Sequence, residues 1–294
     1  MKLNEALKIG RDILLKEDID PREARLLLAF VLQIKIEEIL KVQDISEEDY
    51  NKFYKIIEKR ANGEPFAYLV GKKEFMKLDF EVNSNVLIPR EDTEKLVQEV
   101  IEFVTQNQDL LVNSKGIEEE QVSNNIKILD MCTGSGCIAI SLAKYLKQVD
   151  VWAVDVSEEA LTVAQKNAEK NEVEVSFVLS DLFEKIDENI DEKFDVIVSN
   201  PPYIQTEVIK KLQKEVKKEP TLALDGGESG IIFYEKIIDE APKYLKDNGL
   251  LAFEIGYDQG EIVSKLMIDN GFENVVVKKD LGNQDRVVMG SLRK

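Results

Sequence analysis

The chain has 294 residues, of which 44% are hydrophobic, so it is long enough for one large domain or two smaller ones with a full apolar core. It carries 39 basic and 57 acidic residues and no histidine, which gives a formal net charge of -18. The absence of histidine excludes catalytic triads, general bases and metal sites that depend on an imidazole.

The acidic excess lies in the C-terminal two thirds of the chain. Residues 1–85 carry 15 basic and 17 acidic residues, whereas the remainder carries 24 and 40. Phosphate binding needs clustered lysine and arginine. The densest basic segment, 210–218, has glutamates within and beside it, as is typical of a solvated helix face. This distribution argues against nucleic acid as the main partner.

The two cysteines, Cys132 and Cys137, are too few for a disulfide framework and lack the other ligands of a zinc site. We therefore expect reduced thiols and no metal. The first residues do not resemble a signal peptide, and no apolar run reaches membrane-spanning length. We expect a cytoplasmic monomer that does not bind membranes.

Residues 1–63 show only helical patterns. Asp20, with a proline directly after it, is expected to cap one helix. Ser46 and Asp49 resemble a capping box at the start of another helix, and Gly63 is expected to end it. This segment predicts a small helical bundle without obvious chemistry.

The next segments change in character. Residues 64–90 are expected to form a strand-containing connector, residues 91–105 a helix, and residues 106–125 a polar, flexible insertion. From residue 126 onward, strand patterns alternate with helical ones. The seven strand-like runs are 126–131, 149–154, 173–179, 194–199, 250–255, 275–277 and 286–289.

Helical patterns lie between the first five of these runs, which predicts an α/β domain over 91–294 with a mostly parallel, Rossmann-like sheet covered on both faces. The last two runs have no helix between them and are expected to pair antiparallel at one edge. In such a sheet, ligands bind beyond the carboxyl ends of the strands. The residues that follow each predicted strand are therefore the candidates for a site.

A glycine-containing run follows the first predicted strand. Glycines there allow the backbone to approach a ligand closely and the next helix to start tightly. A tight turn without a ligand remains an alternative, since the run lacks the third glycine of the dinucleotide fingerprint. The candidate ligand-binding residues are Cys132, Thr133, Gly134, Ser135 and Gly136.

Carboxylates follow the second and third predicted strands. Asp155 is placed to accept hydrogen bonds from ribose hydroxyls, with a helix-capping role as the alternative. Asp181 could accept a hydrogen bond from an adenine amino group while Leu182 packs against the ring. Here the alternative is a loop aspartate that caps a turn.

The four residues Asn200-Pro201-Pro202-Tyr203 follow the fourth predicted strand. The two prolines remove two backbone donors and stiffen the loop, which leaves carbonyls that can face a ligand. Asn200 offers a side-chain carbonyl and Tyr203 a flat face. Together these groups could hold an NH2 group by its two hydrogens, with the nitrogen lone pair free. A purely structural turn is the alternative.

This arrangement suits methyl transfer from S-adenosylmethionine to a planar amide or amine nitrogen, with S-adenosylhomocysteine as the product. The sulfonium is already a reactive donor, so the protein must supply an in-line arrangement and an available lone pair. Hydrogen bonds from the NH2 group to Asn200 and to the Pro201 carbonyl would localise electron density on nitrogen as charge develops. The reaction needs no strong base, in agreement with the absence of histidine.

Further motifs accompany this loop along nearly the whole chain. With them, the chain resembles the release factor glutamine methyltransferases, the PrmC/HemK family. The motifs are Glu64-Pro65 with Tyr68 and Gly71, Leu87 to Arg90 with Thr93-Glu94, Asp130 to Gly136, Asp155, Asp181, Glu219-Pro220, Leu224 to Gly227, Glu254 to Gly256, and Asp280 with Asp285-Arg286.

The resemblance implies a seven-stranded class I methyltransferase domain behind an N-terminal helical bundle. It implies that the substrate is the glutamine of the Gly-Gly-Gln loop of peptide chain release factors. By the same resemblance, 132–136, Asp155, Asp181 and Leu182 would hold the cofactor, and Asn200 to Tyr203 the glutamine amide, with Asn200 also near the methionine part of the cofactor. The chain departs from the family at Cys132, usually glycine, at Glu91-Asp92, often Pro-Glu, and at Leu182, often aromatic.

Two other functions remain open from the residues alone. An adenine-N6 methyltransferase acting on DNA or RNA would hold an amino group with the same hydrogen-bonding face, although the charge distribution argues against it. A non-catalytic, cofactor-binding scaffold is the other alternative, because the N-terminal bundle could bind a partner in either case.

Overall fold

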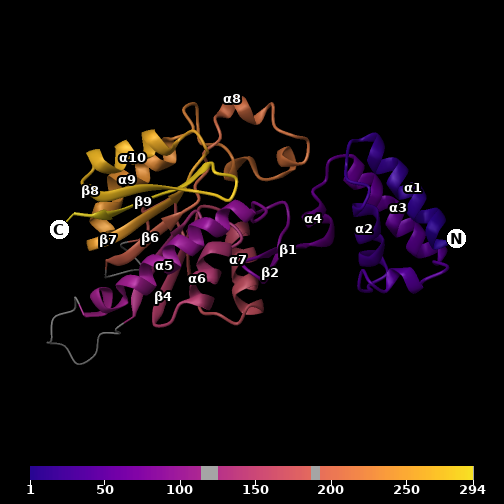
Figure 1. Cartoon of the computed structure of the whole chain (residues 1–294), viewed down its shortest axis with the longest axis horizontal. Coiled ribbons are helices and arrows are strands. Elements are labelled where there is room, and N and C mark those ends of the chain that lie inside the picture. The colour runs from indigo at the N-terminus through magenta and orange to yellow at the C-terminus, as the bar shows by residue number, and fades with distance from the viewer. Residues whose placement is uncertain (114–124, 187–192, 294) are drawn as a thin grey trace. The chain divides into compact units, whose positions relative to one another are not determined.

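The computed structural model describes residues 1–113, 125–186 and 193–293. The chain divides into two compact units, one of Met1–Lys72 with Leu212–Lys218 and one of Lys73–Lys211 with Glu219–Lys294 (Figure 1). The expected division into a bundle ending at residue 63, a connector and a catalytic domain stays a prediction.

The smaller unit is helical, as expected. Ser46 caps its third helix, since its Oγ accepts a hydrogen bond from the Asp49 backbone N–H at 3.0 Å. Gly63 follows that helix with a φ of +88°. The helices are α1 (Leu3–Lys16), α2 (Glu23–Val31), η1 (Ile39–Lys41), α3 (Glu47–Ala61) and α4 (Phe66–Val70).

The expected cap at Asp20 is wrong by position. The Asp20 carboxylate accepts a hydrogen bond from the Arg22 backbone N–H at 2.8 Å, and α2 begins only at Glu23. The carboxylate thus closes a turn before the helix. This turn uses the same short-range bonding that favours aspartate at helix caps.

The buried charge of the smaller unit is paired. Arg60 is 6% exposed and lies beside Glu23, with 2.5 Å between Nε and Oε2. Its Nη1 lies 2.6 Å from Glu215 Oε2, and Glu215 belongs to the Leu212–Lys218 segment of the same unit. One buried guanidinium therefore joins α2, α3 and that loop segment.

The larger unit begins with a hairpin and a long helix, namely β1 (Lys72–Phe75), β2 (Leu78–Glu81) and α5 (Glu91–Asn113). The flexible insertion expected from residue 106 is wrong as far as Asn113, since α5 continues that far. Leu111 packs against the same core as Val97, Val100 and Val104, so the apolar stripe extends into the polar stretch. Residues 114–124 lie outside the described residues.

Seven strands form one sheet in the order β5-β4-β3-β6-β7-β9-β8. The first five are parallel, and β8 and β9 pair antiparallel at one edge, as the sequence predicts. β9 also pairs antiparallel with β7, which joins this pair to the parallel strands. The strands are β3 (Ile126–Met131), β4 (Val149–Asp155), β5 (Ser176–Leu179), β6 (Phe194–Ser199), β7 (Leu245–Glu254), β8 (Phe272–Lys279) and β9 (Asp285–Leu292).

Helices cover both faces of this sheet (Figure 1). α5, α6 and α7 share one apolar core with the sheet, and α9 and α10 share the other. None of the helices in the described part of the chain is long and apolar enough to cross a membrane. The helices after α5 are α6 (Cys137–Tyr145), α7 (Glu158–Lys170), α8 (Thr206–Ile209), η2 (Val216–Lys218), η3 (Thr221–Ala223), α9 (Ile232–Tyr244) and α10 (Gly260–Asp269).

The helix expected between the third and fourth strands is absent over the described residues 180–186. Leu182 has a φ of +47° there, which interrupts helical backbone geometry. Phe183 and Ile186 are buried, so a short turn anchors this connection. Residues 187–192 lie outside the described residues.

The strand order reverses between β3 and its neighbours β4 and β6. Because these strands are parallel, the loops that follow β3, β4, β5 and β6 emerge at the same edge of the sheet. The candidate residues named from the sequence lie in these loops, except Asp155, which is the last residue of β4.

Asn167 on α7 joins the first hairpin to the loop after β3. Its side chain is fully buried. Its Oδ1 accepts from Glu81 N at 2.6 Å, and its Nδ2 donates to Glu81 O at 3.0 Å and to Ser135 O at 2.9 Å. One side chain thus joins α7 to β2 and to the loop at the carboxyl end of β3.

Asn167→Ala should lower the free energy of unfolding by about 3 kcal/mol, because three backbone groups lose their partner. The matched control is Lys166→Ala at the exposed neighbouring position, which should change it by less than about 0.5 kcal/mol. Urea denaturation measures both values. Equal stability of the two variants would contradict the assigned role of Asn167.

Candidate active site

A cavity of about 240 Å³ lies at the carboxyl ends of β3, β4, β5 and β6. Gly136, Pro201 and Tyr203 do not line it. Among the described residues, no cluster of three or more Cys, Asp or Glu side chains could hold a metal ion. The predicted residues that do line the cavity are Cys132, Thr133, Gly134, Ser135, Asp155, Asp181, Leu182, Asn200 and Pro202.

Asp130, at the end of β3, fixes the loop below the cavity. It is fully buried, and its Oδ2 accepts hydrogen bonds from Thr133 Oγ1 at 2.6 Å and from Ala139 N at 3.1 Å. Burial raises the pKa of Asp130 to about 7, although these two hydrogen bonds act in the opposite direction. No role of its own was predicted for Asp130 from the sequence, although its position at the end of a predicted strand could have indicated one.

The two loop glycines have different functions in the structure. Gly134 has a φ of +56° and donates its backbone N–H to Asp155 Oδ2 at 2.8 Å. Gly136 has a φ of +81°, and a Cβ there would lie 2.9 Å from Ile140 Cδ1 and 3.1 Å from Ala164 Cβ. Gly136 therefore allows α6 to start and to pack against α7, while Gly134 lies at the cavity.

Two cavity residues other than glycine have left-handed backbones. Cys132 has a φ of +62° and Leu182 a φ of +47°. This conformation costs a residue with a Cβ about 1 to 2 kcal/mol, and such residues concentrate at functional sites. Burial raises the pKa of the Cys132 thiol, which therefore stays protonated.

Asp155, at the end of β4, lines the cavity without capping α7. Its Oδ2 accepts from Gly134 N, and its Oδ1 accepts from Ser157 N at 3.0 Å. The cap of α7 is Ser157, whose Oγ accepts from Ala160 N at 3.1 Å. Burial raises the pKa of Asp155, while the backbone hydrogen bonds lower it. Each carboxylate oxygen keeps a lone pair for a ligand hydroxyl.

A second segment holds the loop of Asn200 to Tyr203. Ile204 N donates to Leu224 O at 3.0 Å, and Gly226 N donates back to Ile204 O at 2.8 Å. A Cβ at Gly226 would lie 2.7 Å from Tyr203 Cα and 2.9 Å from Pro202 O. Only glycine allows so close an approach, which accounts for the Leu224-to-Gly227 motif.

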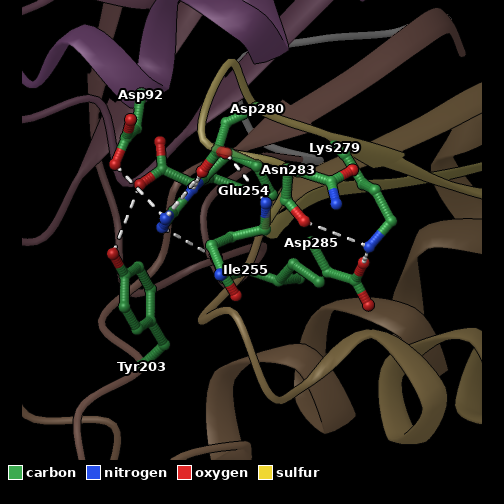
Figure 2. A network of polar contacts seen from close by, with 10 residues as sticks. Asp92, Tyr203, Glu254, Ile255, Lys279, Asp280, Asn283 and Asp285 are labelled. Carbon is green, nitrogen blue, oxygen red and sulfur yellow. Dashed lines mark hydrogen bonds and ion pairs between the residues drawn. The ribbon is translucent and has the colours of Figure 1, made fainter.

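Tyr203 lies behind the cavity wall and points to a buried carboxylate (Figure 2). Its hydroxyl donates to Glu254 Oε1 at 3.3 Å, and its backbone oxygen accepts from Gln259 Nε2 at 3.2 Å. Burial, followed by the charge of Glu254, raises the pKa of Tyr203, so its hydroxyl stays protonated. Neither Glu254 nor Gln259 was assigned a role from the sequence.

The Pro89-Arg90 and Glu219-Pro220 motifs meet at the other side of the cavity. Glu219 is 4% exposed, and its Oε2 accepts from Ile88 N at 3.0 Å. Its Oε1 accepts from Arg90 Nη2. Pro89, Arg90 and Pro220 all line the cavity, so two distant motifs build one wall.

Comparison with known proteins identifies the family of this chain. The profile described as "Methyltransferase small domain" matches residues 110–228, and the "PrmC N-terminal domain" matches residues 5–71. The release factor glutamine methyltransferase of Clostridium acetobutylicum is 39% identical over 98% of this chain and 98% of its own length. That of Thermodesulfovibrio yellowstonii is 38% identical over 97% of each chain.

The chain belongs to the release factor glutamine methyltransferase family. Family membership makes it a methyltransferase and implies that S-adenosylmethionine is its methyl donor. The fold agrees, since a methyltransferase from Pyrococcus furiosus superimposes with a TM-score of 0.51 at 19% identity, over 83% of this chain and 99% of that one.

Within this methyltransferase, the left-handed backbone at Cys132 predicts an order of stability. Cys132→Gly should stay within about 1 kcal/mol of wild type, because glycine adopts this φ without strain. Cys132→Val should lose about 2 kcal/mol, because a branched Cβ is strongly disfavoured there.

The matched control is Cys137→Val at the first position of α6, where the backbone is helical. Thermal unfolding of the three variants compares the two positions. If valine were tolerated equally at both, backbone conformation would not distinguish them.

Proposed function

We propose that this enzyme transfers a methyl group from S-adenosylmethionine to the side-chain amide nitrogen of the glutamine in the Gly-Gly-Gln motif of peptide chain release factors. The supporting observation is that Asn200 and Pro202 line the same cavity as Asp155 and Asp181, in a chain of this family. The loop of residues 132–136 and the loop of Asn200 to Tyr203, called the amide loop below, therefore border a common cavity.

The residues around the cavity fit the cofactor. The backbone of 132–136, open at Gly134, would receive the amino acid part together with Asn200. Asp155 would accept the ribose hydroxyls, Asp181 the adenine amino group, and Leu182 would pack against the ring. The bound cofactor supplies an electrophilic methyl group and leaves as S-adenosylhomocysteine. The proposal uses no metal.

The amide loop would bind the glutamine by acceptors alone. Asn200 Oδ1 and the Pro201 carbonyl would each accept one amide hydrogen, while Pro202 and Tyr203 shape the site. Neither proline offers a backbone donor that could compete for the nitrogen lone pair. As the N–C bond forms, positive charge develops on nitrogen and these two hydrogen bonds strengthen. One amide proton is then lost to solvent, which restores the neutral amide.

The smaller unit is our candidate for recognising the release factor. Its sequence matches the PrmC N-terminal domain profile, and it contributes no residue to the cavity lining. We place the reaction in the cytoplasm, where release factors work, with a monomeric enzyme. Because the net charge is -18, we propose no direct, sequence-specific contact with nucleic acid.

The first test uses labelled S-adenosylmethionine and a purified release factor. Wild-type enzyme should label the release factor but not its variant with alanine in place of the motif glutamine. Asn200→Ala should lower kcat about 100- to 1,000-fold, as for loss of one preorganised polar group at a developing charge. Binding of S-adenosylhomocysteine should weaken far less than kcat falls, because residues 132–136, Asp155 and Asp181 still hold the cofactor in this proposal.

Equal labelling of both release factors would refute the substrate assignment. Efficient methylation of adenine in DNA or RNA, with steeply salt-dependent binding, would favour the amino-methylating nucleic acid enzymes instead.

The assignment of Asp155 to the cofactor site predicts a separate change, in the affinity for S-adenosylhomocysteine. Asp155→Ala should weaken S-adenosylhomocysteine binding about tenfold to 100-fold, because a charged acceptor and the support of Gly134 are lost. Isothermal titration calorimetry measures the affinity of each variant for S-adenosylhomocysteine. The control is Asp247→Ala, at an exposed position of β7. Unchanged affinity in Asp155→Ala would exclude Asp155 from the cofactor site.

A further inference from the structure

Glu254, the last residue of β7, carries a buried carboxylate that the proposed reaction does not use directly. Its side chain is 1% exposed. Figure 2 shows it between the Tyr203 hydroxyl and the residues Asp92 and Asp280. Tyr203 donates to Glu254 Oε1 at 3.3 Å, and a hydrogen bond from the Thr93 hydroxyl lowers the pKa of this carboxylate. The carboxylate thus receives donors from the amide loop and from α5.

Thr93 links Glu254 to the other end of the amide loop. It is 2% exposed, lines the cavity, and its Oγ1 lies 3.3 Å from Asn200 Nδ2. A threonine hydroxyl has one hydrogen, and here Glu254 takes it. The atom of Asn200 that faces Thr93 must therefore be the donor, its amide nitrogen. This leaves Asn200 Oδ1 without a protein partner among the described residues.

We propose that Glu254, acting through Thr93 and Tyr203, is the positioning residue that sets which way the Asn200 amide faces. An ionised carboxylate only accepts hydrogen bonds, so it forces both neighbouring hydroxyls to donate. Because Thr93 donates its only hydrogen to Glu254, the Thr93 oxygen accepts a hydrogen bond from Asn200. The amide nitrogen of Asn200 then faces Thr93. This inference rests on the proposed function, in which Asn200 Oδ1 must be free to accept an amide hydrogen.

The surroundings of Glu254 argue against a purely stabilising role. Its Oε2 is buried and has no hydrogen-bond partner among the described residues, which is costly for a carboxylate. Burial raises the pKa of Glu254 to about 7, while the Thr93 hydrogen bond and the charge of Arg286 lower it. The ionised, acceptor-only form of Glu254 therefore predominates above about pH 7, and the hydroxyl directions described here belong to that form.

Arg286 on β9 supplies the positive charge near this carboxylate. Its guanidinium lies 3.1 Å from Asp280 Oδ2 and 3.2 Å from Asp92 Oδ2, and it also donates to Ile255 O at 3.4 Å. These contacts hold the cation beside β7 and account for the Asp280 and Arg286 motif residues. The network thus surrounds Glu254 with one cation and two further carboxylates.

The test compares Thr93→Val, which keeps the shape but removes the hydroxyl, with Thr93→Ser, which keeps the hydroxyl. Thr93→Val should lower kcat on release factor about tenfold or more, since Asn200 can then turn its nitrogen toward the substrate. Its affinity for S-adenosylhomocysteine should stay within about twofold, because Thr93 does not bind the cofactor in this proposal. Thr93→Ser should recover kcat to within about threefold of wild type.

A double-mutant cycle and a spectroscopic readout separate positioning from general damage. In the Asn200→Ala background, Thr93→Val should have almost no further effect, because the two residues act as one unit. The side-chain amide resonances of Asn200, assigned by their loss in Asn200→Ala, should match in wild type and Thr93→Ser and change in Thr93→Val.

The outcomes distinguish this inference from the proposed function. If wild-type enzyme does not methylate the release factor, the proposed function fails, while the Asn200 resonances still test the orientation. If Thr93→Val keeps both the wild-type kcat and the wild-type resonances, the positioning role is wrong. Glu254→Gln gives a second test, because its amide can present a donor to Thr93 and should lower kcat in the same direction.

Discussion

An amide nitrogen can be methylated only if the protein holds it by its two hydrogens and leaves its lone pair free. This constraint demands a site built from acceptors. In the proposed site, Asn200 contributes one acceptor only if its amide faces the correct way, and the two prolines that follow remove competing donors. In our proposal, the bonding from Thr93 to buried Glu254 fixes that direction. On this account, the chemistry of one loop depends on a carboxylate at the end of the neighbouring strand.

The fold brings these groups together through the order of its strands. β6 and β7 are adjacent and parallel, so the residues after Ser199 and at Glu254 emerge side by side. β3 and β4, on the other side of β6, bring the Cys132-to-Gly136 loop and Asp155 to the same edge. The close backbone contact at Gly226 then keeps the amide loop in place.

Local patterns were sufficient to predict most of the fold. Alternating strand and helix signals predicted all seven strands, and Ser46 predicted the start of α3. The errors occurred where a local sequence pattern was compatible with two different structures. The polar stretch after residue 105 hid Leu111, which extends α5, and a left-handed Leu182 replaced a helix by a turn.

The candidate site was predictable only in part. Residues that follow strands could be found because parallel strands bring their ends together. Glu219 and Glu254 could not be assigned roles in this way, since their partners are distant in sequence and depend on strand order. The motif residues Thr93 and Gly226 were visible, but their contacts with Asn200 and Tyr203 required the three-dimensional arrangement.

The most direct measurement of the central claim is tandem mass spectrometry of a release factor after incubation with the enzyme and S-adenosylmethionine. We expect one added methyl group on the peptide that contains Gly-Gly-Gln, located on the side chain of its glutamine. A methyl group found on another residue, or no change in that peptide while the enzyme turns over its cofactor on a different substrate, would contradict the account.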